Sequence, residues 1–256
     1  MRVDLQPAYI LHSRPYRDTS ALLDVLTAEY GRISLVARGA RRSSKGGSSN
    51  ALLQPFMPLL LSFSGRSEMK NLIANEAAGE AIKLHRERMY SGLYVNELLV
   101  RLLHRHDAHP RLFACYGQTL EALAGSAVLD SVLRHFEFTL LEELGYSFDF
   151  DLDGYSGAPV QENGWYHYHP DFGLVARGDT LDPSRPAFAG ADLLIMATGE
   201  FGAEVRLTAK RLLRQVLAVH LGDAPLKSRD LFRNAGTGAG ETGVKETSAA
   251  AAKVSK

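Results

Sequence analysis

The sequence predicts an α+β protein, with an N-terminal OB-fold β-barrel followed by an α-helical domain that contains an inserted β-hairpin. Two observations lead to this prediction. Residues 8 to about 80 read as five short strands parted by turns, and after residue 83 apolar side chains recur at helical spacing. We therefore expect a barrel domain in residues 1–80, a helical domain in 81–233 with a hairpin insert at about 146–180, and a disordered tail in 234–256.

The expected barrel consists of short segments rich in Ile, Leu and Val, with partial alternation of apolar and polar residues. The segments are AYILH (8–12), SALLDVLTAEYG (20–31), RISLVARG (32–39), PFMPLLLSFSG (55–65) and MKNLIANEAA (69–78). Turns are marked by Arg-Pro at 14–15, Tyr-Gly-Arg at 30–32, a Ser/Gly run at 43–49 and Ser-Gly at 64–65. Because closure removes exposed sheet edges, five such strands favour a small barrel, of which the OB-fold is the most economical.

Four helices are expected in the second domain, each from apolar residues spaced three and four apart. The first carries a stripe from Leu93 to Leu103, and the second covers Leu112 to Leu123. The third runs from Val132 to Leu144 and stops at Gly145, and the fourth runs from Glu204 to Leu221 and stops at Gly222. Between the third and the fourth, WYHYH-PDFG-LVAR reads as a hairpin with a Pro-Asp-x-Gly turn.

Composition and motifs exclude several classes of function. With 45% apolar and 23% charged residues, the 256-residue chain is typical of a soluble globular protein, and no apolar run approaches a membrane span. The N-terminus lacks the apolar core of a secretory signal, so we expect a cytoplasmic protein. Neither a phosphate-binding loop nor a nucleophile with its base is present, so we expect no enzyme and no cofactor.

One segment stands apart in charge. The chain has 29 basic and 29 acidic residues, yet Tyr30 to Ser67 contains no acid. A phosphate backbone attracts cations, and a carboxylate in the footprint would cancel one of them. We therefore expect DNA binding on the barrel face and its loops, through Arg14, Arg17, Arg32, Arg38, Arg41, Arg42, Lys45 and Arg66. The alternative is a solvated face beside a flexible loop.

The chain resembles the RecO family of bacterial DNA-repair and recombination-mediator proteins, and more closely the enteric-like form of that family. The resemblance covers residues 8 to 233 and rests on several long blocks in the same order. These are ILHSRPYRDTSALLDVLTAEYGRISLVARGARR, LLQPFMPLLLSFSGR, YSGLYVNELLVRLL, LRHFEFTLLEELGY and PLKSRDLFR. It implies an OB-fold, a helical domain, DNA binding and strand annealing without nucleotide hydrolysis. It also implies partnership with RecR and with the C-terminal tail of the single-stranded DNA-binding protein, SSB.

A receptor for an SSB tail needs an apolar pocket rimmed by cations, because the tail is acidic and ends in an apolar residue with a free carboxylate. We expect Arg134 to contact it from the edge of the apolar stripe of the third helix, beside Leu133 and Phe136, because an arginine that flanks the stripe is not needed for packing. The other candidates are Arg206, Lys210, Arg211 and Arg214 on the fourth helix, and Lys227, Arg229, Leu231, Phe232 and Arg233 near the end. For Phe232, a terminal helix docked into the core is an equal alternative. A rival function is a general OB-type nucleic-acid binder with no mediator role.

Metal sites are not expected. Many relatives in the resembled family carry paired zinc-binding cysteines where this chain reads DLDGYSGAPVQENGWYHYH, so zinc should be absent and Trp165, Tyr166 and Tyr168 should hold the hairpin by packing. The spacing of three aspartates before Gly154 is similar to the start of an EF-hand calcium loop; they are Asp149, Asp151 and Asp153. Because Val160 occupies the position of the bidentate Glu of such a loop, the sequence favours a solvated acidic turn. His167 and His169 share a strand face without an evident third ligand. Cys115 is expected to pack in the core.

Overall fold

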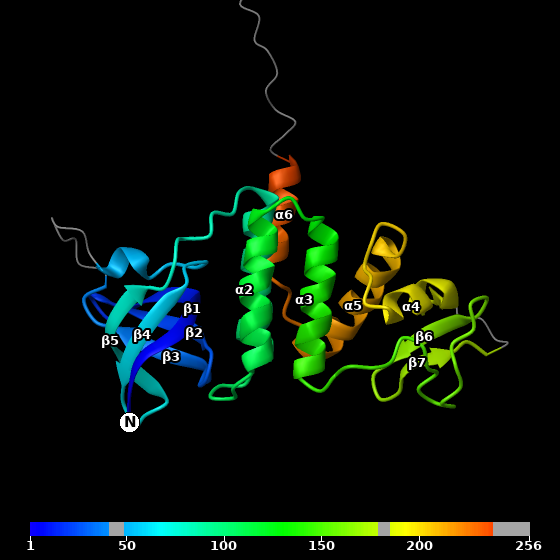
Figure 1. Cartoon of the computed structure of the whole chain (residues 1–256), viewed down its shortest axis with the longest axis horizontal. Coiled ribbons are helices and arrows are strands. Elements are labelled where there is room, and N and C mark those ends of the chain that lie inside the picture. The colour runs from blue at the N-terminus through cyan, green and yellow to red at the C-terminus, as the bar shows by residue number, and fades with distance from the viewer. Residues whose placement is uncertain (41–48, 179–184, 238–256) are drawn as a thin grey trace, which may run out of the picture.

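The computed structural model describes residues 1–40, 49–178 and 185–237, and Figure 1 shows how its parts follow one another in space. The β-barrel lies at one end and a group of helices lies in the middle. A small sheet with helix α4 (Gly190–Ala197) lies at the other end. From that end the chain returns to the middle with its last two helices, residues 206–221 and 228–237.

The barrel contains strands β1 (Arg2–Tyr16), β2 (Ser20–Thr27), β3 (Gly31–Ala37), β4 (Leu59–Ser64) and β5 (Met69–Ala77). They close in the order β1-β2-β3-β5-β4, and β3 pairs with β5 in parallel while the other pairs are antiparallel. The predicted five-stranded OB-type barrel is confirmed. Alternate side chains fill its interior, among them Ile10, Leu23, Ile33, Leu35 and Phe63, all with 0% exposure.

Strand β1 is much longer than the predicted segment 8–12, because it serves two neighbours. Its first half pairs with β4 and its second half pairs with β2. Register shifts between Val3 and Gln6 and between Ile10 and His12 bend the strand around the barrel. These irregularities break the alternation of apolar and polar residues, so the sequence pattern shows only the central part of the strand.

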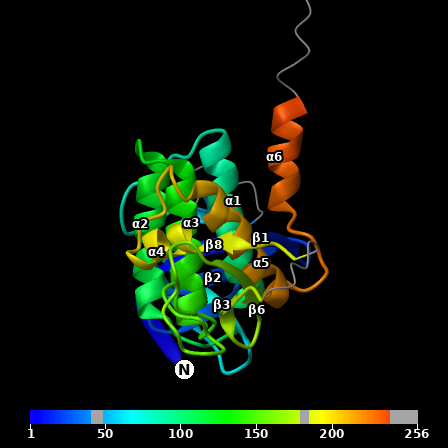
Figure 2. The ribbon, with the colours of Figure 1, turned by 90° about the vertical axis from the view of Figure 1, so that its right-hand side faces the viewer.

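The four predicted helices are present as α1 (Glu87–Leu102), α2 (Pro110–Ala124), α3 (Leu129–Glu143) and α5 (Arg206–Leu221). A further helix, α6 (Ser228–Thr237), stands at the edge of the group of helices (Figure 2). It packs on α1, where the rings of Phe232 and Tyr90 meet edge to face with 5.7 Å between centroids. The short helix α4 was not predicted. Helix α6 continues past Asn234, where a disordered tail was expected to begin, and residues 238–256 of that tail lie outside the described residues.

The barrel and the helices share a continuous core. Leu11 on β1 and Leu26 on β2 belong to the same cluster of buried side chains as α1 and α2. Asn96 on α1 donates from Nδ2 to the carbonyl of Leu11 at 3.0 Å, and the Tyr116 hydroxyl on α2 donates to Asn96 Oδ1 at 2.7 Å. Because both side chains are buried, loss of either hydrogen bond would leave a buried polar group without a partner. These two hydrogen bonds therefore fix the position of the barrel relative to the helices.

The predicted hairpin forms from β6 (Trp165–His169) and β7 (Gly173–Ala176), and β8 (Phe188–Ala189) extends it to three strands. Gly173 has φ 74°, and a Cβ there would lie 2.6 Å from that of Phe148, so glycine is required at this turn. Tyr166 and Tyr168 are buried as expected, but Trp165 is 53% exposed and the prediction that it packs was wrong. Within the described residues, no helix combines the length and the apolar character needed to cross a membrane.

Candidate nucleic-acid interface and peptide pocket

The barrel carries a groove of about 650 Å³, called here the barrel groove. Its lining residues come from the β1–β2 turn, the end of β3, and the β4–β5 turn with the start of β5; they are Tyr16, Arg17, Thr19, Ser20, Val36, Arg38, Gly39, Ser67, Met69 and Asn71. In OB-folds the nucleic acid crosses the face of the second and third strands between these same two turns. The barrel groove therefore lies at the ligand position of this fold.

Two predicted DNA contacts, Arg17 and Arg38, line the barrel groove and are exposed. The guanidinium of Arg17 lies 5.3 Å from the centroid of the Tyr16 ring, and the residue has a positive φ of 52° in the tight turn. Arg38 donates from Nη2 to Asn71 Oδ1 at 3.2 Å, which points its guanidinium across the groove toward β5. A neutral amide partner leaves the full charge of Arg38 available to an anion.

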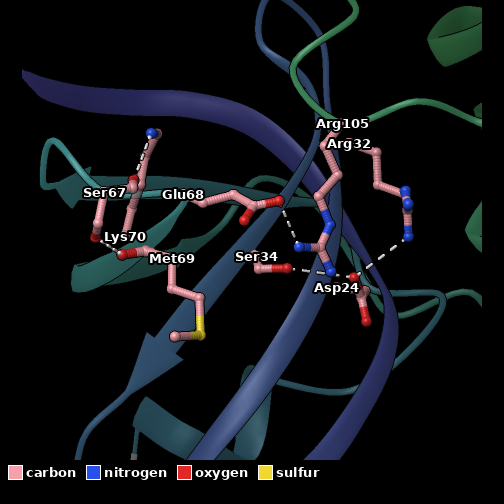
Figure 3. Close-up of polar contacts among 8 residues, drawn as sticks. All are labelled: Asp24, Arg32, Ser34, Ser67, Glu68, Met69, Lys70 and Arg105. Atoms are coloured by element: carbon pink, nitrogen blue, oxygen red, sulfur yellow. Dashed lines mark hydrogen bonds and ion pairs between the residues drawn. The ribbon is translucent and has the colours of Figure 1, made fainter.

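Arg32 is placed differently. It is half-buried on β3 and forms an ion pair with Asp24 on β2, with 3.5 Å between Nη1 and Oδ1, as Figure 3 shows. Ser34 Oγ also lies 3.4 Å from Asp24 Oδ1. Burial lowers the pKa of Arg32, and the neighbouring Arg105 adds to this while Asp24 opposes it. Arg32 is thus tied to an internal carboxylate and is less open to a phosphate than Arg17 or Arg38.

The remaining predicted DNA contacts fall into two groups. Arg14 on β1 and Arg66 in the β4–β5 turn are exposed beside the groove without lining it. Arg41, Arg42 and Lys45 lie outside the described residues.

One basic residue near the barrel face, Arg105, was not predicted from the sequence. Arg105 follows α1 in the segment HRHDAH, far from the acid-free stretch, but it lies beside Arg32 and pairs through Nη1 with Glu68 Oε1 at 2.9 Å (Figure 3). No local pattern could have indicated this position, because it depends on how the helices dock against the barrel.

A second cavity, of about 550 Å³, lies between α1, α3, α5 and α6, and we call it the helical pocket. Apolar side chains on its wall come from Tyr94, Leu129, Leu133 and Phe232. Its basic residues are Arg134, Lys210, Arg214 and Arg229, and its acidic ones are Glu87, Asp130 and Glu137. Five of the residues considered for binding an SSB tail are thus brought to one cavity, namely Arg134, Lys210, Arg214, Arg229 and Phe232.

Arg134 was expected to flank the apolar stripe of its helix without taking part in packing, but it is only 5% exposed and is part of the wall of the helical pocket. Its Nη2 lies 2.6 Å from Oε1 of the buried Glu137, one turn along α3, and the Tyr94 hydroxyl donates to the same oxygen at 2.6 Å. Burial raises the pKa of Glu137, although Arg134 and the hydrogen bond from Tyr94 oppose the rise. The apolar stripe alone did not indicate that a partner on the same helix would draw the guanidinium inward.

The other predicted tail contacts are dispersed. Arg206 and Lys210 both approach Asp130, at 4.0 and 3.4 Å, and Arg206 does not line the pocket. Arg211 lies over the ring of Phe188, 6.0 Å from its centroid, on another side of α5.

The candidates near the end of the described chain also differ from one another. Leu231 is partly exposed and does not line the pocket. Phe232 lines the pocket and also packs on Tyr90, so neither of its two predicted roles excludes the other. The Lys227 backbone N–H is held by Glu97, and the Arg233 side chain lies outside the described residues.

Comparison with known proteins places the chain in a family. Residues 1–79 match the family model for the recombination protein O N terminal, and residues 84–230 match the model for the recombination protein O C terminal. The chain belongs to the RecO family. It is 48% identical to the DNA repair protein RecO of Cellvibrio japonicus over 91% of this chain and 98% of the relative. It is 44% identical to that of Methylococcus capsulatus, over 91% and 94% of the two chains.

In this member of the RecO family, a carboxylate organises the segment where zinc cysteines were considered. Asp153 accepts backbone N–H bonds from Tyr155 and Ser156, both at 2.9 Å, and from Ala176 at 2.7 Å. Burial alone would raise the pKa of Asp153, but these donors outweigh it and lower the pKa below its usual value. The prediction of a solvated turn is wrong for Asp153, which is 5% exposed, whereas Asp149 and Asp151 are exposed.

The two hairpin histidines of this RecO-family chain have separate partners. His167 Nδ1 lies 2.9 Å from the carbonyl of Pro186, and His169 Nδ1 lies 3.9 Å from Asp171 Oδ2. Over the described ranges, no three side chains of His, Cys, Asp or Glu are grouped to hold a metal. Cys115 packs against the helical core as predicted, and burial raises the pKa of its thiol.

Proposed function

We propose that this chain is a mediator of DNA repair and homologous recombination that works by binding rather than by catalysis. It binds single- and double-stranded DNA through the barrel groove, anneals complementary strands, and acts with RecR on SSB-coated DNA in the RecF pathway. Membership of the RecO family and relatives named as DNA repair proteins support this role. The observation that carries it is a basic groove and a cation-rimmed apolar pocket, built on separate parts of one chain.

The barrel groove suits a phosphate backbone. Arg17 and Arg38 face a cavity at the ligand position of an OB-fold, and the acid-free segment supplies β3 and most of the β4–β5 turn. Tyr16 and Met69 offer apolar surface on which a base can stack. Since nothing in the lining forms a pattern for reading base edges, binding should be largely independent of sequence.

The helical pocket suits the acidic tail of SSB. Leu129, Leu133 and Phe232 can receive a terminal apolar side chain, while Lys210, Arg214 and Arg229 can hold carboxylates around it. Arg229 and Arg214 are exposed, so they can pair with the tail without breaking the fold. Arg134 instead supports the base of the pocket through Glu137. RecR is a proposed partner on family grounds, and no residue is assigned to that contact.

The deciding experiment compares annealing of bare strands with annealing of strands coated by SSB, either intact or lacking its tail. Arg214→Glu reverses one exposed charge in the helical pocket and should weaken binding of a labelled tail peptide by roughly 10- to 100-fold, since attraction becomes repulsion. Annealing of bare strands should persist while annealing of SSB-coated strands fails. Arg211→Glu is the matched control, because it makes the same change on the same helix outside the pocket.

The alternative is a general OB-type nucleic-acid binder without a mediator role. It predicts that a tail peptide does not bind, and that annealing is the same on strands coated by intact or tail-less SSB. Equal losses on bare and coated strands in Arg214→Glu would instead place Arg214 on the DNA surface.

A further inference from the structure

The segment after α1 lies directly against the barrel. The backbone N–H of His106 donates to the carbonyl of Arg32 at 3.0 Å, and Arg32 and Arg105 form an isolated parallel bridge. At Gly31, whose φ is 62°, a Cβ would lie 1.8 Å from the carbonyl oxygen of Asp107, so only glycine permits this approach. The position of Arg105 relative to β3 is therefore fixed by backbone contacts.

Arg105 does not line the barrel groove but pairs with a residue next to it. Its partner Glu68 stands in the β4–β5 turn between Ser67 and Met69, both of which line the groove. Figure 3 shows Arg105 and Arg32 lying beside each other, with Glu68 reaching Arg105 from one side and Asp24 reaching Arg32 from below. Glu68 is also the first acid after the acid-free segment.

The ion pair between Arg105 and Glu68 is open to exchange. The two side chains are 35% and 66% exposed, and a pair this exposed contributes little to stability because solvent screens it. A phosphate can take the place of the carboxylate and accept charge-assisted hydrogen bonds from the same guanidinium. Arg32 is less suited to such an exchange, since it and Asp24 are each 13% exposed.

Two further basic groups, Lys70 and His106, lie near Arg105. Lys70, which donates from Nζ to the carbonyl of Ser67 at 3.3 Å, lies near His106. Partial burial is the main cause that lowers the pKa of His106. The positive charges of Lys70 and Arg105 lower this pKa further, and the negative charge of Glu68 raises it. Asp107 is paired with His109 on the far side of the segment, with 3.4 Å between Oδ2 and Nε2. Within the described residues, the carboxylate that pairs with Arg105 is thus that of Glu68, whereas Asp24 pairs with Arg32.

We propose that Arg105 is a phosphate-binding residue that extends the DNA surface of the barrel onto the helical part, and that Glu68 is the internal counter-ion it exchanges for DNA. This rests on the proposed function of the barrel groove. DNA entering the groove beside Tyr16 and Arg17 continues past Ser67 toward Arg105. Glu68 then acts as a competitor that lowers DNA affinity by holding Arg105 in the absence of DNA.

The test is a set of fluorescence anisotropy titrations of labelled single-stranded oligonucleotide at several salt concentrations. Arg105→Gln should weaken binding several-fold and flatten the log–log salt slope by about 0.7, the value for one phosphate of a single strand. Glu68→Gln should tighten binding several-fold, because Arg105 no longer has to leave a carboxylate, and should change the slope little, because the number of phosphate contacts stays the same. Arg105→Lys should recover much of the affinity, since it keeps the charge.

The double variant Glu68→Gln/Arg105→Gln separates exchange from a general loss of negative charge. If Glu68 acts through Arg105, the double variant should bind as weakly as Arg105→Gln. If Glu68→Gln tightens binding equally with and without Arg105, the exchange is refuted. Asp107→Asn is the matched control, because it removes a carboxylate from the segment of Arg105 without releasing Arg105, and it should leave the affinity close to that of the wild type.

Arg38→Gln distinguishes failure of this inference from failure of the proposed function. Weaker binding by Arg38→Gln, together with wild-type affinity and slope in the Arg105 and Glu68 variants, would overturn the inference and keep the barrel groove. Wild-type binding by Arg38→Gln and by the Arg105 and Glu68 variants would overturn both.

Discussion

Replacing Arg134 with alanine should destabilise the protein strongly and in a pH-dependent way. Arg134 and Glu137 are 6% and 1% exposed in their side chains, and 2.6 Å separates their paired atoms. Removal of one partner leaves the other charge buried and uncompensated, which costs about 3–5 kcal/mol. For a chain of this size the loss corresponds to a fall in melting temperature of roughly 6–20 °C.

The pH dependence follows from the direction of the Glu137 pKa. Burial raises this pKa in the folded protein, and Arg134 opposes the rise, so the pKa should rise further in the alanine variant. A carboxyl with a raised folded pKa binds protons more tightly when folded. Its contribution to stability is full below the unfolded pKa and is lost as pH rises through the folded pKa. Arg134→Ala should therefore be closest to wild type in mild acid and furthest from it in mild alkali.

Urea denaturation followed by circular dichroism between mildly acidic and mildly alkaline pH measures this directly. The variant Arg134→Ala/Glu137→Gln should regain most of the lost stability and lose the pH dependence, because no buried charge remains. The Tyr94 hydroxyl can still donate to the glutamine, so the pocket should keep its shape. A destabilisation below about 1 kcal/mol with no pH dependence in Arg134→Ala would show that the guanidinium is at the surface.

Three further predictions concern the barrel, the hairpin and the metal question. Reversal of Arg38, Arg41 and Arg42 to Glu should weaken DNA binding and flatten the log–log salt slope by about 0.7 for each single-strand phosphate that is no longer bound, whereas unchanged affinity and slope in a folded variant would reject the barrel assignment. Asp153→Ala should destabilise the protein by about 2–4 kcal/mol, because three backbone N–H groups lose their acceptor, and Asp153→Asn should lose less; equal melting temperatures would contradict this. Protein refolded with zinc should bind well under one equivalent by atomic emission and keep its melting curve in chelator, and stoichiometric zinc would refute that expectation.

The strands and helices that the sequence predicted are those whose burial follows one regular period. On β3, the apolar Ile33 and Leu35 alternate with the polar Arg32 and Ser34, and the barrel interior takes every second residue, although Ser34 on the other face is buried as well. Where the period breaks, the prediction failed. The N-terminal half of β1 contains an irregularity at Val3–Gln6, and α4 is only eight residues long and apolar on most sides. Neither gives a pattern that distinguishes a strand or a helix from a loop.

Site residues were harder to predict because partners from other elements decide how a charged side chain lies. The pairing of Arg134 with Glu137 three residues later could have been recognised as a helical ion pair. Its burial could not, since it depends on Tyr94 from α1 and on α6 covering the pocket. Arg105 is the opposite case, a residue with no sequence signal that docking brings to the barrel face.

The acid-free segment explains only part of the charge on that face. The barrel groove is assembled from residues 16–20, 36–39 and 67–71, and the first of these, together with Met69 and Asn71 of the last, lies outside the segment. Asp24 and Glu68 stand at one end of the face, each paired with an arginine. An anion approaching the groove therefore meets Arg17 and Arg38 without a paired carboxylate among the described residues, and meets Arg105 only by displacing one. The charge of a surface depends on which side chains are neighbours in the folded protein. A charge pattern in the sequence therefore indicates a cationic surface only where neighbouring residues of the chain form that surface.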